Sequence, residues 1–198
     1  FYTIADTALV GQVLGAQALA AVGTASLVLS VIVNFFIGFS AGLSVLVSHL
    51  YEEKDYARLS ALVQSIFITV ALFAALFTAA GIILTEQLLA ALSTPAELIP
   101  AASLYLRTVL YGMLAQLLYN TASAILRALG NTTSALHYLA AAVVLNIALD
   151  VVLLIVIPCG IAGAATATVL AQYAAALLAL WKLFHLHGTW KLRFNRPF

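Results

Sequence analysis

The sequence contains little charge for its length. Only 8% of its 198 residues are charged, 65% are hydrophobic, and the mean hydropathy is +1.13. A soluble domain of this size covers itself with Lys, Glu, Asp and Arg, whereas residues 59–83 contain none of them. The composition therefore excludes an ordinary soluble domain and predicts a protein whose solvent is the lipid bilayer.

Cysteine and enzyme signatures are scarce as well. The single cysteine, Cys159, has no partner for an internal disulfide and does not suggest a structural metal site. The chain contains no P-loop and no H-E-x-x-H pattern, so nucleotide-driven and zinc-protease functions lack their motifs. A net charge of +1 gives no support for nucleic-acid binding. We therefore expect neither an enzyme nor a bound cofactor.

The chain lacks both an initiator Met and the basic region of a signal peptide ahead of its first apolar segment, so we expect its native start to be missing. This segment, residues 1–10, is too short to cross a bilayer at about 1.5 Å per residue. We expect it to be the end of a helix that begins before Phe1. At roughly 20 residues per span, the length of the chain allows about six spans in all.

Longer apolar segments follow, and they predict membrane-spanning helices. None of them alternates apolar with polar residues as a barrel strand does. Charged or turn-forming residues separate them, at residues 11–17, 51–58 and 130–133. The fold class is therefore an all-α polytopic transmembrane bundle. The predicted spans are residues 18–50, 59–84, 98–129, 134–157 and 162–184, with residues 86–92 at the membrane interface.

Local signals add detail to three of these spans. Gly38 and Gly42 form a G-x-x-x-G pair that lets a neighbouring backbone come close. Thr94 and Pro95 predict the start of the span that follows them. Small residues in the last span indicate close contact with other helices rather than with lipid: Gly163, Ala164, Ala165, Ala167 and Ala171.

Lys and Arg gather on one side of the predicted membrane. The turns on the opposite side contain Glu86 and Glu97 and neither Lys nor Arg. Because cytoplasmic loops carry the excess of positive residues, the positive side is predicted to be cytoplasmic. Arg107 is the exception, inside a span, where it can extend outward or pair with a carboxylate. The residues on the predicted cytoplasmic side are Lys54, Arg58, Arg127, Lys182, Lys191, Arg193 and Arg196.

Two carboxylates, Asp6 and Asp150, lie inside predicted spans. Such a group costs at least about 2.5 kcal/mol at the centre of a membrane helix, so it seldom persists without a role. Either could be a structural carboxylate satisfied by hydroxyls or water, but we favour a proton or cation site. Asn146 lies four residues before Asp150 and therefore on the same helix face. Its carbonyl oxygen beside the carboxylate suits Na⁺ and other hard cations.

Three further polar residues are candidates for the surroundings of this site. Thr168 lies about halfway along the last span and can reach a depth similar to that of Asp150, although an intramembrane Thr more often bonds to its own helix. Tyr2 precedes Asp6 by four residues and can hydrogen-bond to it or pack against it. Asn120 lies within a span, where an amide favours the bundle interior.

Several stretches together resemble the multidrug and toxic compound extrusion (MATE) family of cation-coupled exporters. Residues 6–11 (D-T-A-L-V-G) and 14–23 (L-G-A-Q-A-L-A-A-V-G) resemble its first-helix signature, and residues 126–132 (L-R-A-L-G-N-T) resemble its cytoplasmic turn. Residues 145–150 (L-N-I-A-L-D) and 160–168 (G-I-A-G-A-A-T-A-T) resemble its fifth and sixth helices. Their order and spacing make the resemblance specific.

The resemblance implies a two-lobe transporter, of which residues 1–184 are the N-terminal lobe with a truncated first helix. Residues 185–198 are then a basic cytoplasmic tail that leads toward a missing C-terminal lobe. It also implies an antiporter of the bacterial inner membrane that exports organic cations and drugs by alternating access, driven by Na⁺ or H⁺. The family's cation-binding residues correspond to Asp6, Asn146, Asp150 and Thr168.

Two alternatives remain open. A lipid-linked oligosaccharide flippase of the same superfamily needs several basic residues in its cavity, and Arg107 is the only candidate here. The second alternative is a membrane scaffold, or an aspartyl enzyme in which Asp6 and Asp150 form a catalytic pair. Direct contact between the two carboxyl groups favours the enzyme, whereas a gap bridged by Asn146 or water favours the cation site.

Overall fold

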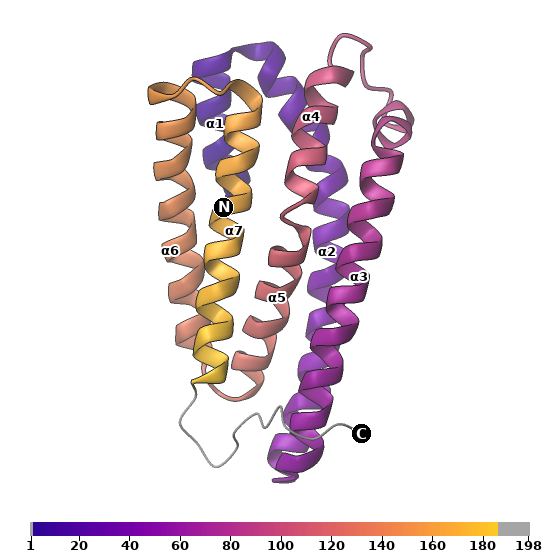
Figure 1. Cartoon of the computed structure of the whole chain (residues 1–198), viewed down its shortest axis with the longest axis vertical. Helices are drawn as coiled ribbons and strands as arrows, with labels where there is room; N and C mark the ends of the chain where they lie inside the picture. Colours follow the sequence, from indigo (N-terminus) through magenta and orange to yellow (C-terminus); the bar gives the residue numbers. More distant parts are fainter. Residues whose placement is uncertain (1, 186–198) are drawn as a thin grey trace.

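Long helices lie side by side along the main axis of the molecule (Figure 1). The computed structural model describes residues 2–185, and the side chains of residues 7–185. All regular structure in that part of the chain is helical, as predicted. The elements are α1 (Tyr2–Leu14), α2 (Ala16–Glu52), α3 (Tyr56–Ala91), α4 (Ile99–Leu110), α5 (Met113–Ala128), α6 (Thr132–Val151), the π-helical turn η1 (Val152–Val156) and α7 (Gly160–Phe184).

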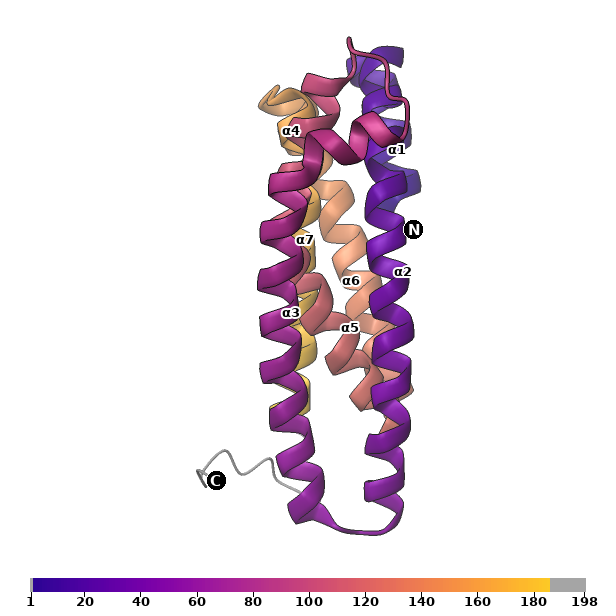
Figure 2. The same ribbon diagram turned by 90° about the vertical axis from the view of Figure 1, so that its right-hand side faces the viewer.

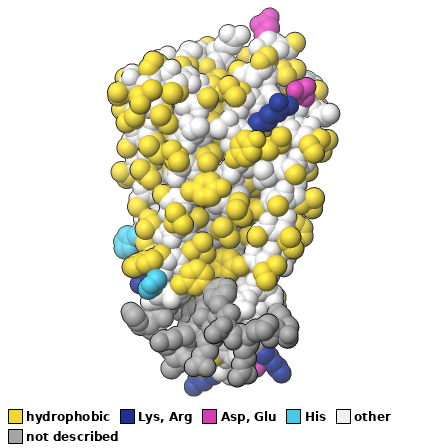
Figure 3. Space-filling view, in the orientation of Figure 1, with side chains coloured by type: hydrophobic (Ala, Val, Ile, Leu, Met, Phe, Trp, Pro, Cys, Tyr) yellow, Lys and Arg dark blue, Asp and Glu magenta, His cyan; other side chains and the backbone are white. Residues whose placement is uncertain are grey.

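The length and composition of these helices suit a membrane. Four are long and apolar enough to cross one: α2, α3, α6 continued by η1, and α7. The bent pair α4 and α5 makes a fifth candidate span. With 13 residues, α1 falls short of a span, as expected for the first apolar segment. Large hydrophobic side chains cover the outside of the bundle (Figure 3), a favourable arrangement when lipid surrounds it.

The helix α7 lies at the centre of the packing and contacts α4, α5 and α6. The small residues predicted to mediate close contact are all buried in it. A Cβ atom added to Gly163 would lie 2.7 Å from the carbonyl oxygen of Leu153, so the turn η1 approaches the α7 backbone closely there. No described residue comes within 4 Å of a Cβ atom added to Gly38 or Gly42, so close approach of a backbone to this pair stays a prediction.

Two predicted boundaries are wrong. The turn expected at residues 11–17 is confined to Gly15, whose φ of 86° only glycine adopts readily. Residues 86–92 mostly continue α3, which ends at Ala91, and their place at the membrane interface stays a prediction. The Thr94 hydroxyl donates to the carbonyl oxygen of Leu89 at 2.6 Å, so Thr94 closes α3 and does not cap α4.

The predicted span 98–129 is broken rather than continuous. Its two halves, α4 and α5, meet at Tyr111 and Gly112 with a bend of 47°. The break brings α4 and α5 against α7 on one side and against α2 and α3 on the other. The α2–α3 hairpin extends beyond the ends of the other helices (Figures 1 and 2), so one end of the molecule is uneven.

Candidate functional site

Asn146 and Asp150 lie one turn apart on α6, and both are completely buried. Neither the amide nitrogen nor the amide oxygen of Asn146 has a hydrogen-bond partner among the described residues. A buried amide without partners costs about 1–3 kcal/mol, so this arrangement is unfavourable for stability alone. The amide oxygen of Asn146 is therefore available to a cation or a water molecule at this depth.

The helix that carries this pair changes character directly after it. Five residues, Val152–Val156, form the π-helical turn η1, in which the backbone N–H of Ile157 donates to the carbonyl oxygen of Val152 at 2.8 Å. Single π-helical turns inside α-helices occur frequently at functional sites. No local pattern predicts this turn, since the segment consists only of Val, Leu and Ile.

Thr168 is buried on α7, and its hydroxyl donates to the carbonyl oxygen of Ala164 at 3.1 Å. This is the bond to its own helix that an intramembrane Thr commonly makes. The side chain also lines the cavity described below. The structure thus places Thr168 on the wall of a second polar region, which the sequence did not predict.

The backbones of Tyr2 and Asp6 belong to α1, but their side chains lie outside the described residues. The helix α1 packs against α2, α6 and α7, so the first helix is next to the two helices that carry the other candidates. The separation of the Asp6 and Asp150 carboxyl groups, which distinguishes a cation site from a catalytic pair, therefore also lies outside the described residues.

A cavity of about 240 Å³ lies between α2, α4, α5 and α7. Leu29, Val33, Val109 and Met113 make apolar parts of its wall, and none of the described side chains that line it is charged. Apolar walls with a few hydrogen-bonding groups are typical of sites for small organic molecules. The polar lining consists of Ser26, Ser30, Asn34, Tyr105, Gln116, Thr168 and Gln172.

The amides of this cavity were missed in the sequence, although Asn34, Gln116 and Gln172 all lie in predicted spans. Their cost at membrane depth, the argument that selected Asn120, applies to them equally. Asn120 itself does not line the cavity. Its side-chain oxygen accepts a hydrogen bond from the side-chain nitrogen of Gln116 at 3.4 Å. Asn120 therefore supports a residue of the cavity wall.

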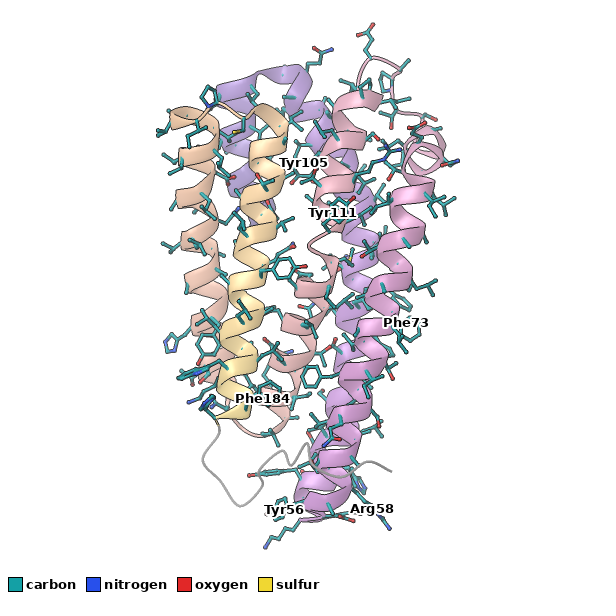
Figure 4. All side chains as sticks on the ribbon, in the orientation of Figure 1. Tyr56, Arg58, Phe73, Tyr105, Tyr111 and Phe184 are labelled. Carbon is teal, nitrogen blue, oxygen red and sulfur yellow. The ribbon has the colours of Figure 1, made fainter. Side chains whose placement is uncertain are left out.

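The break between α4 and α5 forms part of the same wall, because Val109 and Met113 line the cavity on either side of it. Bending frees backbone carbonyls, and neighbouring helices bind them. The Thr78 hydroxyl of α3 donates to the carbonyl oxygen of Leu110 at 3.2 Å, and the Tyr173 hydroxyl of α7 donates to that of Tyr111 at 3.2 Å. Figure 4 labels Tyr111 at this break.

Gly112 is closely surrounded at the break. A Cβ atom at this position would overlap the side-chain oxygen of Gln172, which is buried without a hydrogen-bond partner in the described part of the chain. The cavity, the break and α7 are thus in direct contact through Gln172.

Arg107 pairs with a carboxylate, one of its two predicted outcomes. Its guanidinium lies 3.0 Å from the Glu86 carboxylate, and this ion pair joins α4 to α3. Since Arg107 is neutralised and no basic residue lines the cavity, the flippase alternative gains no support.

One sequence pattern that is typical of enzymes was missed above, and the structure gives it no support. Residues 38–42 read G-F-S-A-G, which matches the G-x-S-x-G pattern of hydrolases, but Ser40 lies within the continuous helix α2. That nucleophile requires a sharp turn from a strand to a helix. Among the side chains of residues 7–185, no group of three or more His, Cys, Asp or Glu residues is placed to hold a metal ion.

The amino-acid sequence is similar to those of known proteins. The MatE family model matches residues 1–152. The chain is 34% identical over 176 residues to the probable multidrug resistance protein YpnP of Bacillus subtilis, covering 89% of this chain and 40% of that protein. It is 31% identical over 175 residues to the probable multidrug resistance protein YoeA of Bacillus subtilis, covering 86% of this chain and 38% of that protein.

Solved structures agree with this similarity. A crystal structure of MATE in the bent conformation matches with a TM-score of 0.91 at 25% identity, covering 99% of this chain and 44% of that one. An inward-facing multidrug resistance MATE family transporter matches with a TM-score of 0.90 at 25% identity, covering 96% of this chain and 43% of that one. The chain thus spans about 40% of the length of the curated relatives named above.

Proposed function

Because this chain belongs to the MatE family of multi-pass membrane transporters, we propose that it is one lobe of a cation-coupled antiporter that exports organic drugs and toxic compounds. The observation that carries the proposal is the completely buried pair Asn146 and Asp150 inside a membrane-spanning helix. In the proposal, residues 1–184 form the lobe, residues 185–198 lead toward a second lobe, and export requires both lobes.

The proposed cation site consists of Asp6, Asn146, Asp150 and Thr168, with Tyr2 beside it. A carboxylate enclosed by apolar helices is stabilised when it binds Na⁺ or a proton. The amide oxygen of Asn146, which lacks a hydrogen-bond donor among the described residues, suits a hard cation. The packing of α1 against α6 and α7 supports a contribution from Asp6.

The uncharged cavity is the proposed contact surface for the exported molecule. Its volume of about 240 Å³ is slightly below the range of roughly 300–1,000 Å³ that is usual for drug-sized ligands, so it would hold part of such a molecule. Thr168 belongs both to the cavity wall and to the proposed cation site. If the cation and the drug favour different packings of α7, an inward cation gradient drives the drug outward by alternating access.

The decisive experiment is drug efflux by the complete gene product in proteoliposomes, driven by an imposed Na⁺ or pH gradient. Asp150→Asn and Asp6→Asn each remove a carboxylate, and we expect each to lower cation-driven efflux by about tenfold or more. Asp55→Asn is the matched control, because Asp55 caps α3 in a loop outside the spans. Wild-type efflux in both site variants would remove the proposed cation site.

The proposed orientation places the α2–α3 and α5–α6 turns, with Lys54, Arg58 and Arg127, in the cytoplasm. Cys159 is exposed in the link between η1 and α7, at the opposite end of α7 from Lys182. In a protein whose only cysteine is Cys159, a membrane-impermeant maleimide should therefore label intact cells. The same reagent should not label a Cys159→Ser, Lys54→Cys variant until the cells are opened, and the reverse pattern would invert the orientation.

A further inference from the structure

Four basic or protonatable side chains lie at the end of the bundle where α5 and α7 end and α6 begins. Arg127 is in the last turn of α5, His137 is near the start of α6, and Lys182 and His185 are at the end of α7. The three helices pack against one another, and the α5–α6 turn and the end of α7 are at the same end of the bundle (Figure 1). We call these four residues the basic patch.

No acidic side chain offsets the basic patch. Residues 98–149 and 151–198 contain neither Asp nor Glu, and Asp150 is buried toward the other end of α6. The ion pairs that the structure describes lie elsewhere and join Arg58 to Asp55 and Arg107 to Glu86, and the His49 ring contacts Glu53. Arg127 and His137 are exposed, and Lys182 is half-buried. The patch therefore presents positive charge that no described acidic residue neutralises.

The neighbouring α2–α3 hairpin carries the same number of Lys and Arg residues but a different balance. Lys54 and Arg58 lie there among Glu52, Glu53 and Asp55, so the hairpin has a net charge of −1. The same end of the molecule thus has one region balanced by acids and one purely basic region.

Aromatic side chains place the basic patch at the level of lipid headgroups. Trp181 is 57% exposed, and its ring stacks on that of His185 with a centroid separation of 5.0 Å. Exposed Trp residues at helix ends mark the membrane–water interface. Histidine and Lys or Arg side chains gather at the lower edge of an otherwise hydrophobic face (Figure 3).

We propose that the basic patch binds the phosphate group of an anionic phospholipid in the leaflet at that end of the bundle. Lys and Arg beside a membrane surface attract anionic lipids, and basic sites between membrane helices bind phosphate headgroups. Apolar acyl chains would lie along the outer faces of α6 and α7, where Leu136 and Leu177 are 65% exposed. The bound lipid joins the ends of helices whose other residues, Gln116 and Gln172, line the cavity.

The test measures lipid binding to the purified complete gene product by native mass spectrometry, with phosphatidylglycerol as the anionic lipid and phosphatidylcholine as the zwitterionic one. The wild type should retain phosphatidylglycerol preferentially. The double variant R127Q/K182Q should bind phosphatidylglycerol about tenfold more weakly, with phosphatidylcholine unchanged.

The matched control is K54Q/R58Q, which removes the same charge from the acid-balanced hairpin, and its phosphatidylglycerol affinity should change less than twofold. An equal loss in both double variants would show that net charge, rather than the patch, attracts the lipid. Undiminished binding by R127Q/K182Q would also overturn the proposal. The charge-preserving variant R127K/K182R should restore binding, and thermal unfolding of each variant separates lost binding from lost folding.

Discussion

The two polar regions inside this bundle differ in charge and in enclosure. On α6, a carboxylate and an amide are completely buried at Asp150 and Asn146. The cavity between α2, α4, α5 and α7 is open enough to hold part of an organic molecule and has no charged residue in its lining. An ion is held best by enclosed oxygen ligands, whereas an organic molecule needs space and a few hydrogen-bonding groups. We infer that the regions bind different partners, and the changes below test that separation.

The largest effect is expected from Asn146→Leu, which removes the amide oxygen beside Asp150. A hydrogen bond to a charged group contributes about 1.5–3 kcal/mol, so cation-driven efflux should fall by roughly ten- to a hundredfold. The measurement is drug efflux over a series of Na⁺ concentrations and pH values. Asn34→Leu removes an amide from the cavity instead and should leave the cation dependence intact. If both variants lose the cation dependence of efflux equally, the two regions are one site.

Gly112→Ala should have the next largest effect, on the stability of the protein. The added Cβ atom would overlap the side-chain oxygen of Gln172 and lie 3.1 Å from both the Val109 carbonyl oxygen and Val169 Cγ2, and such overpacking costs about 1–3 kcal/mol of folding free energy. Thermal unfolding of the purified protein measures this loss. Gly42→Ala serves as the control because nothing lies within 4 Å of its added Cβ. Equal stability of the two variants would mean that Gln172 moves aside freely.

Gln172→Leu should alter drug binding without altering cation coupling. The variant keeps the size of the side chain but removes its amide from the cavity, so drug affinity should fall by about five- to tenfold for drugs with hydrogen-bonding groups. Equilibrium binding of a fluorescent drug gives the affinity, and the Na⁺ or pH dependence of efflux gives the coupling. A shift in that dependence would contradict the separation of the two regions.

The smallest effects are expected from Tyr173→Phe and Thr78→Val, which each remove one hydrogen bond to a carbonyl freed by the break in span 98–129. Each loss should cost about 0.5–1 kcal/mol, measured by thermal unfolding. Thr108→Val is the control, since the Thr108 hydroxyl donates within its own helix to the carbonyl oxygen of Leu104 at 2.8 Å. A larger loss from the control would show that the break needs no support from α3 and α7.

The sequence predicted the features that depend on local composition or on the energetic cost of a carboxylate inside the membrane. Charge-free segments such as 59–83 predicted the spans, and the small residues of α7 predicted its buried position. The cost of a membrane carboxylate singled out Asp150, which is completely buried. The cation role of Asp150, Asn146 and Asp6 stays a prediction.

The features that the sequence did not predict depend on contacts between distant residues. The break at Tyr111 and Gly112 contains no proline, and its freed carbonyls are bound by hydroxyls from α3 and α7. The continuation of α3 past its predicted end accompanies the pairing of Glu86 with Arg107 of the next helix. The cavity forms where four helices meet, so no single segment of sequence contains its pattern.

The π-helical turn η1 makes the codons for residues 152–156 sensitive to deletion. A π-helical turn holds one residue more than an α-helical turn, so loss of a single codon within residues 152–156 would convert this segment to regular α-helix. Asn146 and Asp150 lie upstream and would keep their places on α6. The link that follows would rotate by about 100° relative to them, and Leu153 would lose its close approach to Gly163. We therefore expect this short stretch to tolerate apolar substitutions readily but to reject single-residue deletions.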